Sequence, residues 1–211
     1  MHFIIDNFLP EVEQEIMKNM ITHCPHTMSF GTVFKGYRDN LPFVDSLKDD
    51  FDLIQFESKI IEYGKIVIPN ENLFNDIWGM FIANNIEEHI KKIRNRDDYH
   101  LRRMKCNFLS QKFTLWHKPH TPHVDVDDNF TIVNDLPKDT NAVSAIYYVN
   151  STDGPTVLYN EKENDNPKKL TVYKKITPKQ GRLLVFDSQR YHTSTSPIRH
   201  KHRQVINMIF Y

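Results

Sequence analysis

The sequence predicts an α+β protein in which a mainly helical N-terminal part supports an antiparallel β-domain. Apolar residues recur at helical spacing in the first hundred residues, whereas short β-branched and aromatic runs separated by turn residues fill the second half. Six or more short strands at regular spacing are typical of an antiparallel sandwich or barrel. With 211 residues the chain is long enough to bury its own core. We expect one unit with two parts, residues 1–102 as the support and residues 103–211 as the β-core.

Composition excludes several classes of function. The 27 basic and 27 acidic residues balance, which argues against a nucleic-acid binder that relies on a broad basic face. The two cysteines, Cys24 and Cys106, form no paired-thiol motif, so neither a disulfide scaffold nor a cysteine-rich zinc site is expected. No apolar run approaches the ~20 residues of a membrane helix, and no secretory signal opens the chain. We therefore expect a soluble, cytoplasmic protein with no membrane partner.

The first half of the chain has mainly helical periodicity. Pro10 suits the first turn of a helix, and the acids that follow it are favoured by the helix dipole. The expected buried stripe of this helix is Val12, Ile16, Met20 and Ile21. Residues 25–48 are ambiguous and are interpreted as short strands joined by turns. Residues 50–61 indicate an amphipathic helical piece that is broken near Gly64 and Pro69. A longer helix capped at Asn70 or Asn72 follows, with a face made of Leu73, Ile77, Phe81, Ile86 and Ile90 and with Trp78 in the core.

After His100 the period changes from helix to strand. The strongest strand candidate is residues 142–149, in which β-branched and aromatic residues form a continuous run. A turn, Asp153-Gly154-Pro155, separates it from the next candidate. The other expected strands are residues 104–109, 112–116, 156–159, 170–176, 182–186 and 204–210.

The densest group of chemically active side chains is the segment Trp116–Asp125, Trp-His-Lys-Pro-His-Thr-Pro-His-Val-Asp. Its prolines exclude a helix. On an extended backbone, side chains two residues apart point to the same face, so His123 and Asp125 can reach one ion. A His-x-Asp pair alone is a weak signal, because a metal centre of this kind needs a third ligand.

The third ligand candidate is His192, which a strand and a short turn deliver. Two imidazoles and one carboxylate on one face of a metal leave the opposite positions open, as Fe(II) requires when it must also accept a cosubstrate and oxygen. Zinc fits the same donors less distinctively. Arg203 opens the last strand, and an inward-facing arginine there can bind a carboxylate through two parallel hydrogen bonds. The plain alternative is that these are ordinary polar residues of a β-domain.

Together these residues resemble the Fe(II)- and 2-oxoglutarate-dependent oxygenases, most closely the prolyl-4-hydroxylase-like branch. The resemblance covers about residues 103–211. It depends on four elements in the right order, namely His123-Val124-Asp125, Ile146–Asn150 before a glycine turn, Gly181–His192, and Arg203 before the final strand. It implies a double-stranded β-helix, a cupin-like jelly roll with helices that support one sheet.

The resemblance also implies roles for individual residues. Three residues would be the metal ligands and form the catalytic centre: His123, Asp125 and His192. Arg203 would pair with the distal carboxylate of 2-oxoglutarate, and Tyr148 would hydrogen-bond the same carboxylate. Inward alternation places Ser144 and Ile146 on the face of Tyr148, so we include them in the cosubstrate site. Phe113 stands where many relatives carry a tyrosine, which places more weight on Arg203 and Tyr148.

The implied activity is that of a dioxygenase that hydroxylates a C–H bond of a protein side chain, with proline as the nearest precedent, or of a small molecule. The implied coproducts are succinate and CO2. The implied cofactors are Fe(II), 2-oxoglutarate as cosubstrate and O2, with ascorbate as a candidate reductant. The partner would be a peptide or small-molecule substrate, and the oligomeric state is left open. Because Asp125 is retained, hydroxylation is favoured over halogenation.

Two other functions are alternatives to hydroxylation: oxidative demethylation of nucleic acid, and ligand binding without catalysis. Oxidative demethylation of nucleic acid uses the same chemistry, but that branch typically carries another arginine later in the final strand, where this chain has Met208, Ile209 and Phe210. Neutral net charge also argues against it. A non-catalytic jelly-roll module that binds a ligand would have no need to keep the three candidate ligands together with Arg203.

The remaining histidines and the longest loop have less specific interpretations. His117 and His120 are either residues of a pocket rim or plain loop histidines, and Trp116 either lines the pocket or packs under the sheet. His200 and His202 are expected in an exposed turn rather than at the metal. The loop of residues 126–141 is longer than most, so we expect it to close over substrate together with residues 161–169.

Overall fold

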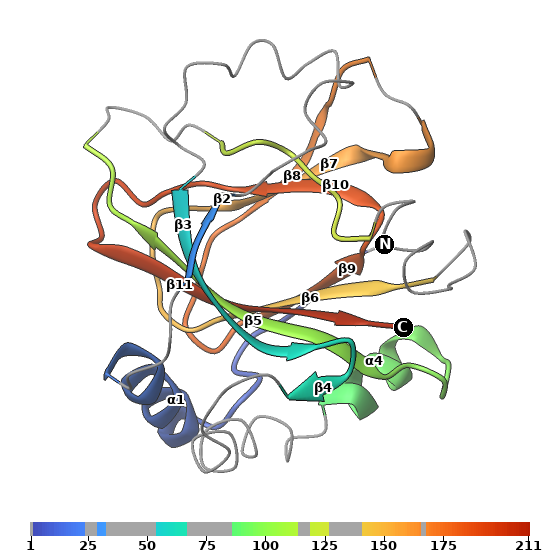
Figure 1. Ribbon diagram of the computed structural model, residues 1–211, viewed down its shortest axis with the longest axis horizontal. Helices are drawn as coiled ribbons and strands as arrows, with labels where there is room; N and C mark the ends of the chain where they lie inside the picture. The colour runs from blue at the N-terminus through green and yellow to red at the C-terminus, as the bar shows by residue number, and fades with distance from the viewer. Residues whose placement is uncertain are drawn as a thin grey trace.

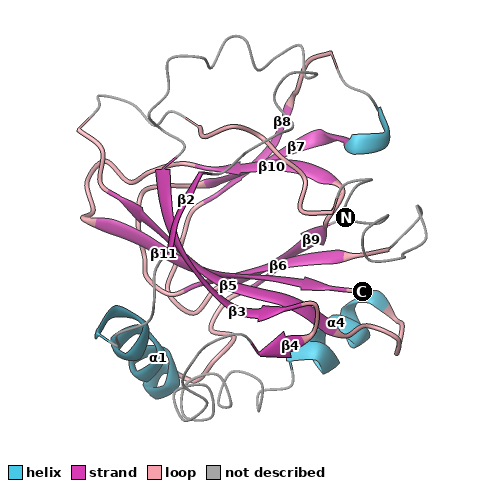
Figure 2. Cartoon of the chain, viewed as in Figure 1, coloured by secondary structure: helices cyan, strands magenta, loops and turns pink. Residues whose placement is uncertain are grey.

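The computed structural model describes residues 2–23, 29–32, 54–66, 86–113, 119–126, 141–165 and 168–211. Two antiparallel sheets face each other, and helices lie outside one of them (Figures 1 and 2). The helices are α1 (Glu11–His23), α4 (Ile86–Arg94) and the short 3-10 helix η5 (Glu163–Asp165). The strands are β1 (His2–Ile5), β2 (Ser29–Thr32), β3 (Ile54–Glu62), β4 (Lys65–Ile66), β5 (Leu101–Ser110), β6 (Val143–Tyr148), β7 (Thr156–Lys162), β8 (Val172–Ile176), β9 (Leu183–Asp187), β10 (Arg190–Ser194) and β11 (His202–Phe210).

The two sheets form a jelly roll. The major sheet has the strand order β1-β9-β6-β11-β5-β3-β2, with β4 paired to β3, and the minor sheet has the order β10-β7-β8. Neighbouring strands of the major sheet come from distant parts of the sequence, as in the pairing of β11 with both β5 and β6. The α+β class and the double-stranded β-helix predicted from the sequence are confirmed.

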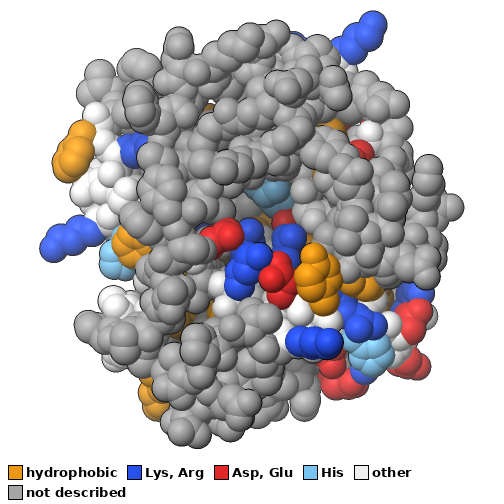
Figure 3. Space-filling model, in the orientation of Figure 1, with side chains coloured by type: hydrophobic (Ala, Val, Ile, Leu, Met, Phe, Trp, Pro, Cys, Tyr) orange, Lys and Arg blue, Asp and Glu red, His pale blue; other side chains and the backbone are white. Residues whose placement is uncertain are grey.

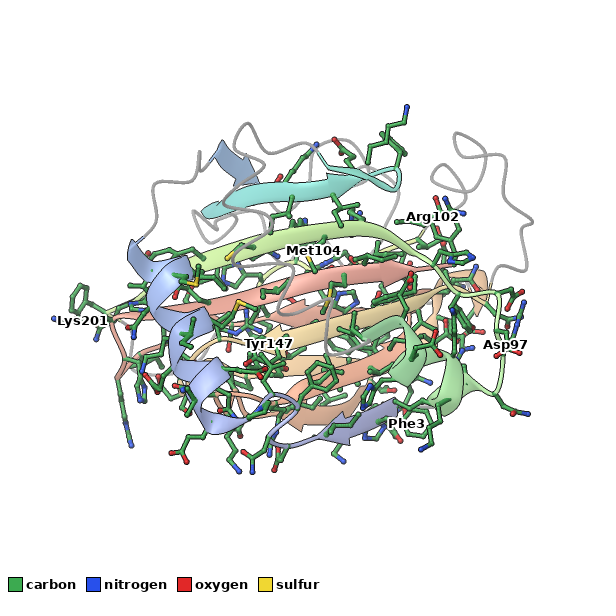
Figure 4. All side chains as sticks on the ribbon, turned by 90° about the horizontal axis from the view of Figure 1, so that it is seen from below. Phe3, Asp97, Arg102, Met104, Tyr147 and Lys201 are labelled. Carbon is green, nitrogen blue, oxygen red and sulfur yellow. The ribbon has the colours of Figure 1, made fainter. Side chains whose placement is uncertain are left out.

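Strand alternation gives the major sheet two chemically different faces. In the central strands, Cys106, Tyr147 and Ile206 belong to the core under α1 and α4. Figure 4 shows Met104 and Tyr147 on this outer face, the one that the two helices cover. Ile146 points the other way and packs with Leu158 of the minor sheet. The outer face therefore holds the main hydrophobic core, and the inner face is left to line the space between the sheets.

Helix α1 forms where it was predicted, but its buried stripe is different. Val12 is 72% exposed and Ile16 is 41% exposed, whereas Met17 and Ile21 are buried. The buried face includes Gln14, whose side-chain amide donates to the carbonyl oxygen of Leu9 at 2.8 Å. Of the predicted stripe, Ile21 is buried and Met20 packs against the core. Val12 and Ile16 were wrong, because the polar Gln14 takes a buried position that hydrophobic periodicity does not mark.

The predicted helical piece at residues 50–61 is wrong where the structure describes it, because Ile54–Glu62 form strand β3. This strand is hydrogen-bonded to β2 on one side and to β5 on the other. Its register shifts between Lys59 and Ile61, and a bulge there leaves Ile60 and Ile61 both buried. Two consecutive buried residues break the strict alternation of a strand and imitate helical spacing.

A tight hairpin explains the break seen near Gly64. Tyr63 and Gly64 have φ angles of 53° and 73°. Two consecutive residues in the left-handed region are typical of a two-residue β-hairpin turn. Here they join β3 to β4. The longer helix expected to follow is confirmed only at its end, as α4, because residues 67–85 lie outside the described ranges.

Most predicted strands of the second half are confirmed within a few residues, as β5, β6, β7, β8, β9 and β11. Strands β1 and β10 were not predicted. Of the expected strand at residues 112–116, Lys112 and Phe113 lie in no strand and the rest lies outside the described ranges. The expected lid loop is likewise outside them, apart from its ends. Among the described residues, no helix is long and apolar enough to cross a membrane.

Replacing Met17 with alanine tests the packing of α1 on the major sheet. Met17 is fully buried, so the substitution should lower the free energy of unfolding by about 2–5 kcal/mol, from lost burial and the cavity left behind. Val12→Ala, on the exposed side of the same helix, should change it by no more than about 0.5 kcal/mol. Urea unfolding measures both variants. Equal losses would contradict the orientation of α1.

Candidate metal centre

Backbone hydrogen bonds join the segment around His123 to the strand around His192. His123 and His192 form an antiparallel bridge in which each backbone N–H donates to the other residue's carbonyl oxygen at 2.9 Å. The backbone N–H of Asp125 donates to the carbonyl oxygen of Ser188, in the turn between β9 and β10, at 3.0 Å. These bonds hold the His-x-Asp segment against the strand that carries the distal histidine, which is how residues 69 positions apart meet.

The side chains of His123, Asp125 and His192 converge. One ligand atom from each lies within 4.8 Å of the others. Nε2 of His192 is 3.5 Å from Oδ2 of Asp125, and the two imidazole rings have their centroids 4.3 Å apart. His192 and Asp125 are buried, whereas His123 is partly exposed. The structure thus brings together all three residues that the sequence analysis singled out as ligands.

Backbone carbonyls fix the orientation of both imidazoles. Nδ1 of His123 lies 3.3 Å from the carbonyl oxygen of Thr121, and Nδ1 of His192 lies 3.1 Å from that of Arg190. A carbonyl only accepts, so Nδ1 carries the proton in each ring, and Nε2 presents its lone pair. Histidines that bind metals in proteins are usually oriented by such a bond on the other ring nitrogen.

Burial sets the charges of the three side chains. Desolvation lowers the pKa of His123 to about 3 and also lowers the pKa of His192, so both imidazoles are neutral near pH 7. Burial alone would raise the pKa of Asp125, but the positive charges near it, from His192 and then Arg103, outweigh burial and lower that pKa. Since His192 is neutral near pH 7, Arg103 is the cation that stabilises the carboxylate there. The result is two neutral imidazoles beside one carboxylate.

Arg103 and Ser144 contact the two oxygens of the Asp125 carboxylate. Nη2 of Arg103 donates to Oδ1 at 2.8 Å, and the hydroxyl of Ser144 donates to Oδ2 at 2.6 Å. The Ser144 hydroxyl also lies 3.0 Å from that of Ser188. Ser144 was predicted beside the cosubstrate, and in the structure its hydroxyl contacts the candidate ligand Asp125. Arg103 was not predicted.

A second polar group lies deeper between the sheets, around Arg203. This guanidinium donates from Nε to the carbonyl oxygen of Gly154 at 3.0 Å and from Nη2 to Oγ1 of Thr156 at 2.8 Å. The hydroxyl of Tyr148 donates to the same Thr156 oxygen at 2.7 Å. All three side chains are buried. Ile146, the other predicted member, belongs to the adjoining apolar cluster with Tyr148. Thr156 was missed, because a threonine that begins a strand carries no functional signal.

Gly154 is required by the close approach of two chain segments. A Cβ atom at this position would lie 2.5 Å from the backbone oxygen of Thr195. Real side chains do not tolerate such a distance, so glycine lets the turn before β7 pass beside the segment that follows β10. The carbonyl of Gly154 is thereby placed where Arg203 binds it.

The other histidines have structural partners. His120 is buried, with Nε2 3.1 Å from the hydroxyl of Ser196, so it lies inside the structure rather than on a pocket rim. His200 is half exposed and pairs with Asp153 at 2.9 Å, as expected for a turn residue. The ring of His202 stacks on Phe108 with the centroids 5.2 Å apart. Residues 116 and 117 lie outside the described ranges.

The donor set fits a divalent iron. Neutral imidazoles with a hard carboxylate are the ligands of non-haem Fe(II) centres that keep positions open for other molecules. In the space-filling view, a histidine side chain and several charged side chains are visible in a hollow near the middle of one face (Figure 3). Among the described residues, this is the group of three histidine, cysteine or acidic side chains arranged to hold one metal ion.

Known proteins resemble this chain in sequence over its second half and in fold. Residues 112–211 match the family model of the 2OG-Fe(II) oxygenase superfamily. An oxidoreductase of the 2OG-Fe(II) oxygenase family from Burkholderia pseudomallei has a similar structure, with a TM-score of 0.62 at 12% identity over 99% of this chain and 84% of that one. The prolyl hydroxylase from Trichoplax adhaerens, solved with a hypoxia inducible factor peptide, has a TM-score of 0.56 at 16% identity, over 100% and 83%.

The fold also resembles that of an enzyme with a different activity. The non-haem α-ketoglutarate-dependent epimerase SnoN from nogalamycin biosynthesis has a TM-score of 0.60 at 10% identity, over 100% of this chain and 77% of that one. No curated protein matches the sequence. At these identities the solved structures establish the shared fold, and the choice of substrate must come from this chain's own residues.

Acid should destabilise the metal-free protein through His123. In the unfolded chain this imidazole takes a proton at its ordinary pKa of 6.5, whereas in the folded protein it does so only at about 3. The stability that the neutral His123 imidazole contributes is therefore fully present above pH 6.5, and this contribution is lost as the pH falls toward 3. Between pH 7 and pH 5 the loss from this group is about 2 kcal/mol. Urea unfolding at the two pH values should show a smaller difference for His123→Gln. An identical difference would contradict the assignment.

Proposed function

We propose that this chain, whose residues 112–211 match the 2OG-Fe(II) oxygenase superfamily, is a 2-oxoglutarate-dependent enzyme that hydroxylates a C–H bond of a small molecule or a peptide side chain. The observation that carries the proposal is the convergence of His123, Asp125 and His192 within 4.8 Å, with their charges set for a divalent metal. Hydroxylation of this kind consumes O2 and 2-oxoglutarate, places one oxygen atom in the product and the other in succinate, and releases CO2.

The three candidate ligands would hold Fe(II), which supplies the oxidising chemistry when bound. His123 and His192 contribute neutral Nε2 lone pairs that need lose no proton near pH 7. Asp125 contributes the single negative charge. Arg103 and Ser144 hold the two carboxylate oxygens, so the side chain is oriented before the metal arrives.

Arg203, Tyr148 and Thr156 would bind the distal carboxylate of 2-oxoglutarate. Arg203 is buried with its guanidinium held by two neutral oxygens, from Gly154 and Thr156. The guanidinium is therefore a buried cation with no carboxylate among these hydrogen-bond partners. Burying a charge without a counter-ion is unfavourable, and an incoming carboxylate would supply one through charge-assisted hydrogen bonds. Tyr148 and Thr156 add hydroxyl groups on the same side.

Binding of iron and cosubstrate gives the first test. Under anaerobic conditions, Fe(II) and 2-oxoglutarate together should produce a visible charge-transfer absorption band, and admission of O2 should then release succinate. His123→Ala should abolish both signals, because one of three ligands is lost. His100→Ala, which removes an exposed imidazole before β5, should keep both. Absence of the band from the wild-type protein would overturn the proposed function.

The role of Arg203 can be separated from metal binding. Arg203→Met should weaken 2-oxoglutarate binding by roughly ten- to a hundredfold, since a charge-assisted contact contributes about 1.5–3 kcal/mol. Binding of Fe(II) alone should be unchanged. Arg182→Met, which removes a guanidinium paired with Asp6 at the surface, is the matched control. Titration of the charge-transfer band measures the affinity, and wild-type affinity in Arg203→Met would assign the cosubstrate site elsewhere.

A further inference from the structure

The inner faces of β3, β5 and β11 carry a group of polar side chains whose role is not accounted for by the candidate ligands or Arg203, apart from the contact of Arg103 with Asp125. Lys105 stands opposite Asn207 in the pairing of β5 with β11, and Asn107 stands opposite Glu57 in the pairing of β5 with β3. Nζ of Lys105 donates to Glu57 at 3.2 Å. Arg103 is the next inward residue along β5. We call these five residues the polar floor.

Among the residues that the structure describes, three atoms of the polar floor are buried and have no hydrogen-bond partner. They are Oδ1 of Asn107, Oδ1 of Asn207 and Nε of Arg103. Asn207 as a whole is only 5% exposed. Nearly all buried polar atoms in native proteins are paired, because an unpaired one is destabilising. Two acceptors and one donor left unpaired on adjoining strands therefore indicate a ligand that this face is built to receive.

The unpaired atoms specify the chemistry of that ligand. It must donate hydrogen bonds to the two amide oxygens and accept one from Nε of Arg103. Lys105 has further N–H donors beyond the one that binds Glu57. The cosubstrate 2-oxoglutarate has no N–H or O–H donor near pH 7, so it leaves the amide oxygens unpaired. A molecule with an ammonium group and a carboxylate satisfies both kinds of atom.

Building on the proposed function, we propose that the polar floor binds the primary substrate and that this substrate is a free α-amino acid. Its ammonium group would be bound by Asn107, Asn207 and Glu57, and its carboxylate by Arg103 and Lys105. The floor adjoins the candidate metal centre, since Arg103 also contacts Asp125 at 2.8 Å. An internal peptide segment has neither charged group.

Direct binding to the metal-free protein tests the proposal. The probes are the common L-α-amino acids and the N-acetyl amide of each, which lacks both charges. By titration calorimetry, at least one free amino acid should bind, and its N-acetyl amide should bind at least tenfold more weakly. Asn207→Leu should weaken that binding at least tenfold and leave 2-oxoglutarate affinity unchanged. Asn160→Leu, at an exposed asparagine of β7, is the matched control.

Thermal stability separates a binding role from a structural one. Because Oδ1 of Asn207 has no hydrogen-bond partner in the described part of the chain, Asn207→Leu should leave the melting temperature unchanged or raise it. A lowered melting temperature would mean that Asn207 supports the fold. The proposal is overturned if no amino acid binds, if the N-acetyl amides bind equally well, or if Asn207→Leu weakens 2-oxoglutarate binding by the same factor. Because the calorimetry uses metal-free protein, the amino-acid binding test is independent of the iron-dependent absorption band that tests the proposed function.

Discussion

The backbone bridge between His123 and His192 is the contact on which the site depends. The ligands come from a proline-rich segment and from a strand of the minor sheet, and neither segment could present three donors alone. The two hydrogen bonds of 2.9 Å in this bridge, with the Asp125 bond to the Ser188 carbonyl, fix the distance between the segments. The carbonyls of Thr121 and Arg190 then fix the rings. Backbone hydrogen bonds thus bring the three donor side chains together.

The central strands serve the core and the site at once because alternate residues face opposite ways. In β6, Tyr147 packs under the helices while Ser144 and Tyr148 face the site. In β11, Ile206 and Met208 are core residues while Arg203 and Asn207 face inward. A shift of one residue in the pairing of β11 would exchange the two sets. The hydrophobic outer face therefore specifies the register that places the functional residues.

Much of the fold and the candidate ligands could be predicted from local pattern. Three motifs can be recognised from their residue types and their order along the chain: the His-x-Asp pair, the strand with two tyrosines, and Arg203. Arg103 and Thr156 could not be predicted, because their partners are 22 and 47 residues away and appear only when β5 and β7 are assembled. Strand β3 was misread because its bulge buries two consecutive isoleucines. In α1, Val12 and Ile16 were assigned to the buried stripe because the polar Gln14, which is buried, does not register as part of a hydrophobic pattern. Tertiary pairing decided each of these cases.

The central claim is that His123, Asp125 and His192 hold one iron. Its most direct test is a crystal structure of the protein grown anaerobically with Fe(II), with anomalous diffraction recorded at the iron absorption edge. We predict a single strong anomalous peak at bonding distance, about 2.0–2.2 Å, from Nε2 of both histidines and an oxygen of Asp125. A peak bound by other side chains, or no peak among these three in protein that contains iron, would contradict the assignment.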